Sequence, residues 1–93
     1  MTNDRFKSND SCNDPKLFKW LDITSQSEPW MSLDDALEMK PAVMMSVGWI
    51  VKETPEYITI ASTYDTDEEL VGDVNCIPRK TIMEIIPVRP VNI

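Results

Sequence analysis

The sequence predicts a mainly β fold: a small, strongly bent antiparallel β-barrel with one short N-terminal α-helix. Three observations predict it. From Val43 onward the hydrophobic period is two, which is typical of strands. Turn residues then divide the chain into short segments that are rich in β-branched and aromatic residues. Gly48 and Gly72, the only glycines, each fall within a predicted strand, where glycine often marks the bend that lets a short sheet close.

The 93 residues predict one domain. Residues 1–15 are polar, with Phe6 as their single aromatic residue, and we interpret them as a disordered polar arm. Residues 16–93 form the single small barrel domain. Its first part, the apolar cluster 17–23, is too brief to be assigned as helix or strand, and we expect it to pack on the core as a flap.

The helix is predicted over residues 32–41. Ser32 is a favourable N-cap, and Asp35 follows it three residues later as in a capping box. Pro41 ends the helix because the residue before a proline is disfavoured in helical conformation. Leu33 and Leu37 fall on one side of it.

The first predicted strand after the helix has one wholly apolar set of alternating residues, which we expect to face the core. This set is Val43, Met45, Val47, Trp49 and Val51. Further strands are predicted at residues 57–64, 70–77 and 81–88, separated by a turn at 53–56, an acidic loop at 65–69 and a tight turn at 78–80.

The net charge disfavours some classes of partner. Sixteen acidic and nine basic residues give a net charge of −7, which disfavours binding to nucleic acid or to anionic membranes. No apolar run approaches a membrane span, and the first ten residues lack the hydrophobic core of a signal peptide. We expect a cytoplasmic protein.

The residue types also argue against catalysis. The chain has no histidine, the commonest general base and metal ligand, and its two glycines cannot build a phosphate loop. We expect no enzyme, no metal and no cofactor. Cys76 is expected inside the sheet as a structural thiol, with a reactive thiol as the alternative. The acidic loop 65–69 is interpreted as a solvated turn, the alternatives being a calcium site or a contact for a basic partner.

Two groups of residues are candidates for binding. Arg79 and Lys80, the only adjacent basic pair, are candidate ligands for a phosphate, a nucleotide or another small anion, or otherwise form a plain solvent-exposed turn. Candidate protein-interface residues are Trp20, Trp30, Met83 and Ile85. The two tryptophans could instead seal an edge of the core. The last strand is apolar on both faces, which predicts a homo-oligomer that covers one of them.

The order of elements over residues 32–88 resembles the Sm-like small barrels. GWIVKE at 48–53 followed by ITI at 58–60 is similar to that family's first motif, and IPRKTI at 77–82 is similar to its second. In Sm-like proteins the basic turn lines the hole of a ring and contacts RNA, so the resemblance implies this role for Arg79 and Lys80, which stand where Arg-Gly is usual. The segments GWIVKE, ITIAST and IPRKTI also resemble short uncharacterised bacteriophage proteins, which implies a phage origin and the cytoplasm of the host cell.

Together these features predict a non-enzymatic binding protein that acts as a homo-oligomer on a host protein or a small ligand. The alternative is an Sm-like nucleic-acid or nucleotide-binding protein that uses the turn at Arg79 and Lys80.

Overall fold

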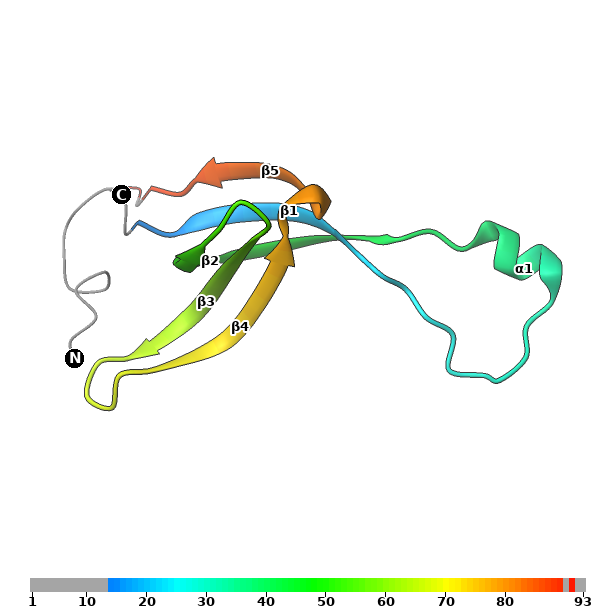
Figure 1. The fold of residues 1–93 in the computed structure, drawn as a ribbon, viewed down its shortest axis with the longest axis horizontal. Coiled ribbons are helices and arrows are strands. Elements are labelled where there is room, and N and C mark those ends of the chain that lie inside the picture. The colour runs from blue at the N-terminus through cyan, green and yellow to red at the C-terminus, as the bar shows by residue number, and fades with distance from the viewer. Residues whose placement is uncertain (1–13, 90, 92–93) are drawn as a thin grey trace.

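The computed structural model describes residues 14–89 and 91, and it is mainly β, as predicted. Its elements are β1 (Lys16–Asp22), α1 (Leu33–Glu38), β2 (Ala42–Glu53), β3 (Tyr57–Asp65), β4 (Leu70–Pro78), the 3₁₀ turn η3 (Arg79–Thr81) and β5 (Ile82–Pro87). The strands form one antiparallel sheet in the order β4-β3-β2-β1-β5 (Figure 1). The polar arm predicted for residues 1–15 lies outside the described residues except for Asp14 and Pro15.

The expectation that the helix precedes all strands is wrong. The apolar cluster that follows Pro15 is strand β1, which pairs with β2 on one side and with β5 on the other. Phe18, for example, lies opposite Ser46 of β2 and Ile85 of β5. A seven-residue segment carries no periodic signal long enough to identify it, and only its distant partners make it a central strand.

Strand β2 bends at Gly48 and thereby joins two halves of the sheet. Residues 42–48 of β2 pair with β1, whereas residues after Gly48 pair with β3. A Cβ atom at Gly48 would lie 2.7 Å from the carbonyl oxygen of Ala61, so only glycine allows this close approach. A register irregularity between Ile50 and Lys52 adds to the bend. The predicted bending is thus present at the first glycine.

Closure of the sheet into a barrel is not confirmed. β4 and β5 are the two ends of the strand order, and within the described residues no pairing joins them. Figure 1 shows the β3–β4 hairpin turned away from the layer formed by β1, β2 and β5. The fold is therefore an open, strongly bent sheet, and its core lies in the concave side of the bend.

The core is small and comes from both halves of the sheet. Phe18 of β1 packs with Ile58 and Ile60 of β3 and with Ile77 of β4, all of them fully buried. Three partly buried residues surround this cluster: Trp20, Ile50 and Ile82. Burial of four large side chains is a modest core for a chain of this length.

The prediction of which side of β2 faces the core is wrong over the first part of the strand. Val43, Met45 and Val47 are 54%, 63% and 48% exposed. Trp49 and Val51, the other two members of the predicted set, are half-buried. In the first part of β2, Ser46 lies opposite the buried Phe18 and Gly48 is itself buried, so the less hydrophobic alternating set faces the core there.

Residues 23–41 connect β1 to β2 and extend away from the sheet, with α1 near the far end (Figure 1). We call them the projecting segment. The Oγ of Ser32 accepts a hydrogen bond from the backbone N–H of Asp35 at 3.1 Å, which confirms the predicted N-cap. Every residue of the projecting segment is exposed. Among the described helices none has the length and apolar character needed to cross a bilayer.

Candidate functional site

Arg79, which the sequence predicts as an anion-binding residue, makes contacts within the fold. Its Nε donates a hydrogen bond to the carbonyl oxygen of Thr54 at 2.6 Å, and its Nη2 forms a 2.8 Å ion pair with the carboxylate of Glu53. Its backbone N–H also donates to the carbonyl of Glu56. Arg79 therefore ties η3 to the β2–β3 turn. The guanidinium charge and the N–H donors of Arg79 that make these contacts are largely unavailable to an external ligand.

Lys80, the other member of the pair, is exposed. Its side chain makes no hydrogen bond or ion pair to the residues described here, so one free cation remains at this turn. A single exposed lysine holds an anion only weakly, because its charge is fully hydrated.

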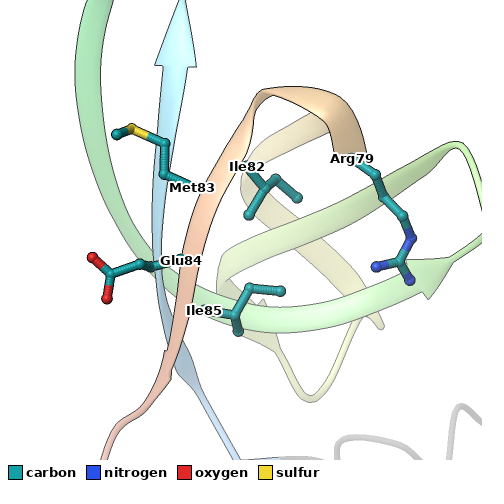
Figure 2. A pocket seen from close by; sticks show the side chains of 5 residues that line it. All are labelled: Arg79, Ile82, Met83, Glu84 and Ile85. Atoms are coloured by element: carbon teal, nitrogen blue, oxygen red, sulfur yellow. The ribbon is translucent and has the colours of Figure 1, made fainter.

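Figure 2 shows a shallow pocket beside η3, with a volume of about 440 Å³. It is lined by Arg79, Ile82, Met83, Glu84 and Ile85. In the figure Ile82, Ile85 and Arg79 project to one side of β5, whereas Met83 and Glu84 project to the other. The pocket thus follows an edge strand and is not enclosed. The two charged groups of the pocket are the carboxylate of Glu84 and the guanidinium of Arg79, which is already paired with Glu53. The pocket is therefore poorly suited to bind an anion.

The remaining predicted interface residues lie in different settings. Trp20 is half-buried against the core, and its indole N–H donates to the Oγ of Ser46 at 3.1 Å, so it seals the core edge. Met83 and Ile85 are exposed on β5, at the edge of the sheet. Trp30 lies in the projecting segment with 89% of its surface exposed.

The projecting segment has a concentration of exposed apolar side chains. Besides Trp30, the residues Ile23, Leu33 and Leu37 are 86%, 74% and 73% exposed, and Met39 is partly exposed. Leu33 and Leu37 are four residues apart in α1, which places them on one side of the helix. No residue of α1 is buried, so nothing in the described chain covers this side. A six-residue helix gains little stability by itself in water, which makes its uncovered apolar side unusual.

A second apolar surface lies on the side of the sheet that faces away from the core. Here Leu17, Lys19 and Leu21 of β1 stand opposite Val47, Met45 and Val43 of β2, and Ile86 and Glu84 of β5 continue the first two rows. We call this surface the outer face. Its one ion pair among the described residues joins Lys19 to Glu84 at 4.0 Å. The Leu21–Val43 row lies next to the start of the projecting segment.

The acidic loop uses one carboxylate to form its own turn. The Oδ1 of Asp65 accepts hydrogen bonds from the backbone N–H groups of Asp67 and Glu68 at 3.0 and 3.2 Å. Within residues 14–89 and 91, His, Cys, Asp and Glu form no group of three or more that could hold a metal ion. The geometry is that of a solvated turn.

The expectation that Cys76 lies inside the sheet is wrong. It is exposed on β4, opposite Thr59 of β3. Lys52 occupies the same row on β2, and its ammonium group lies 5.5 Å from the ring centroid of Tyr57. The hydrogen bond with the Tyr57 side chain, followed by the electrostatic interaction with the same side chain, raises the pKa of Lys52 above its usual value of 10.5. The row contains a thiol and a cation but no general base.

The sequence predicts Trp30 as a candidate interface residue but does not predict most of the exposed apolar surface around it. It placed Leu33 and Leu37 on one side of a helix, but a helical stripe normally predicts a buried side. The outer face was missed because its residues were assigned to the core. One signal was available for the projecting segment: two leucines on a helix too short to stand alone.

No protein-family model, curated protein or solved structure matched this chain. The Sm-like and bacteriophage resemblances therefore stay predictions, and the geometry of the chain carries the functional argument.

Proposed function

We propose that this chain is a non-enzymatic protein-binding module whose recognition element is the projecting segment. One observation carries the proposal: Trp30, Leu33 and Leu37 are at least 73% exposed on a segment that has no buried residue. Large apolar side chains gathered in this way mark interaction surfaces. Tryptophan is also among the residues most enriched at the energetic centre of protein interfaces.

The residues of the chain support binding rather than catalysis. It has no histidine, and its exposed thiol, Cys76, lies in a row with Lys52 and Thr59, without a carboxylate or imidazole to activate it. Arg79 serves the fold through Glu53 and Thr54. The groups that remain available on the surface are apolar side chains and scattered charges.

Nucleic-acid or nucleotide binding through Arg79 and Lys80 has weaker support. Its one favourable feature is the exposed Lys80 on a short, hydrogen-bonded turn. Against it stand the net charge of −7 and the intramolecular ion pair of Arg79. If this alternative is right, an oligonucleotide binds with an affinity that falls as salt rises, and Lys80→Ala removes that binding.

The proposal is tested by affinity capture with the full chain as bait. The wild type is compared with a Trp30→Ala/Leu37→Ala double variant and with Leu70→Ala, which replaces an exposed leucine outside the projecting segment. Proteins that bind the segment are retained by the wild type and by Leu70→Ala and are lost with the double variant. Circular dichroism of each bait checks that the fold is unchanged. If the double variant captures the same proteins in the same amounts, the projecting segment is not the recognition element.

A further inference from the structure

We propose that the projecting segment binds a second copy of this chain, and that it packs on the outer face of the partner in a two-fold symmetric dimer. This inference rests on the proposed function, because it names the partner of the same recognition element. It is argued from the position of the two apolar surfaces and their combined area.

The projecting segment lies away from the outer face of its own chain. It continues outward from the end of the β1–β2 ribbon, and Figure 1 shows α1 far from the strands. Every residue from 23 to 41 is exposed, so within the described chain the segment does not cover that face. A segment from a second molecule can lie there.

Symmetry favours an identical partner. In a two-fold symmetric dimer, the projecting segment of each copy packs on the outer face of the other copy. One interface therefore covers both apolar surfaces of both molecules. A different protein bound to the segment alone would leave Val43, Met45 and Val47 in water. A second copy of this chain covers both surfaces with surfaces that the chain itself presents.

The combined area is sufficient for a stable dimer. Ten apolar residues contribute: Ile23, Trp30, Leu33, Leu37 and Met39 of the segment, and Leu21, Val43, Met45, Val47 and Ile86 of the outer face. Their exposed fractions correspond to roughly 1,000 Å² per copy, against the roughly 800 Å² that each partner contributes to an interface of standard size. The exposed apolar area of the projecting segment alone, or of the outer face alone, does not clearly exceed what one partner contributes to a standard interface. The combined area of the two surfaces does.

The net charge of the molecule opposes this contact, which therefore depends on its apolar area. α1 carries Asp34, Asp35 and Glu38, and the outer face carries one charge of each sign, Lys19 and Glu84, paired at 4.0 Å. Two chains of net charge −7 repel each other at longer range. Added salt screens that repulsion, so we expect the dimer to tighten as ionic strength rises.

The oligomeric state of the full chain, measured by sedimentation velocity from micromolar to submillimolar concentration, tests the proposal. We expect a monomer–dimer equilibrium that Trp30→Ala/Leu37→Ala weakens by at least about tenfold. Met45→Ser/Val47→Thr, on the opposite surface of the same contact, is expected to weaken it by a similar factor. Leu70→Ala is the matched control and leaves it unchanged. A monomer at all concentrations, or a dimer that neither double variant weakens, overturns the proposal.

Cysteine cross-linking tests the arrangement itself. In a background with Cys12→Ser and Cys76→Ser, a Leu37→Cys chain mixed with a Met45→Cys chain is expected to form a mixed disulfide dimer on oxidation. Leu70→Cys mixed with Met45→Cys is the control that does not. Equal cross-linking of both mixtures would overturn the proposed packing.

The two proposals fail in different ways. If the chain is monomeric but still captures other proteins through Trp30 and Leu37, the second-copy proposal is wrong and the protein-binding function stands. If the chain dimerises without the segment and captures nothing through it, both proposals are wrong.

Discussion

Gly48→Ala is predicted to destabilise the fold because it places an atom where the sheet bends. A Cβ at this position would lie 2.7 Å from the carbonyl oxygen and 3.1 Å from the carbonyl carbon of Ala61. Those are backbone atoms of the interior strand β3, and Ala61 is itself buried and paired with Trp49 and Val74 on its two sides. The neighbour therefore cannot move aside as a flexible side chain would.

The size of the effect follows from two opposing contributions. Overpacking against a rigid neighbour costs up to about 3 kcal/mol. Replacing glycine in a strand recovers about 0.5–1 kcal/mol, because alanine loses less backbone entropy on folding. The net loss is about 2 kcal/mol. For a domain of this size it corresponds to a fall of about 8–16 °C in Tm.

Gly72→Ala is the matched control. Gly72 also lies within a strand, but its nearest contact for an added Cβ is the Cβ of Thr63 at 3.5 Å, an ordinary van der Waals distance. Neither glycine has a positive φ, so backbone conformation does not separate the two variants. We expect Gly72→Ala to be neutral or to stabilise the fold by up to about 1 kcal/mol.

Thermal unfolding followed by far-UV circular dichroism, at one protein concentration and salt concentration, measures both variants against the wild type. Urea unfolding supplies the free energies. The reasoning is refuted if the free energies of the two variants differ by less than about 0.5 kcal/mol, the range of an ordinary surface substitution. In that case the close approach at Gly48 would not be what determines the bend.

Three further predictions concern the core, the basic turn and the Lys52–Tyr57 contact. Phe18→Ala is expected to lower the free energy of unfolding by about 3–5 kcal/mol, because it empties the centre of a small core; a loss below 1 kcal/mol in urea unfolding would contradict that placement. Arg79→Ala is expected to lower the free energy of unfolding by about 1–2 kcal/mol, because its contacts to the β2–β3 turn are lost. Lys80→Ala is expected to change it by less than about 0.5 kcal/mol. Equal effects of the two variants in urea unfolding would argue against this division of roles. Tyr57→Phe is expected to lower the pKa of Lys52 toward 10.5, as followed by NMR titration; because the folded-state pKa is raised, the stabilisation is fully present below pH 10.5 and is lost as pH rises through the folded-state pKa. An unchanged Lys52 titration would show that the tyrosine hydroxyl is not the cause.

The exposed surfaces and the small core describe the same physical situation. Four fully buried large side chains contribute only part of the stability that a chain of this length needs, while eighteen large apolar residues of the described chain are exposed, ten of them in the proposed contact. Covering those residues in a dimer would add stability by mass action. The Tm of the wild type is then expected to rise with protein concentration, and that of Trp30→Ala/Leu37→Ala is not.

Several features of the fold could be predicted from the sequence because they depend on neighbours in the chain. The N-cap at Ser32 needs only a backbone N–H three residues away, and the structure contains that hydrogen bond. The β3 and β4 strands were recognisable from β-branched residues and from the turns beside them. The bend at Gly48 was recognisable because a glycine inside a strand indicates a close backbone approach.

Tertiary structure decided which surfaces are buried. Both alternating sets of β2 contain apolar residues, so the period identified a strand without identifying its inner side. The choice was made by Phe18, which pairing between β1 and β2 brings opposite Ser46, 28 positions away by residue number. Phe18 is fully buried on the side of the ribbon that it shares with Ser46 and Gly48, so the alternating residues Val43, Met45 and Val47 face outward.

The candidate site likewise combines features that the sequence predicts with features that depend on contacts between distant residues. From the sequence alone follow a mainly β chain, a net charge of −7, the absence of histidine and the position of Trp30 outside any strand. The contacts that hold Arg79 to Glu53 and Thr54, and the exposure of Trp30, follow from the folded arrangement of the chain. Composition and period are properties of neighbouring residues, whereas burial and pairing depend on contacts between residues far apart in the chain, which exist only once the sheet has formed.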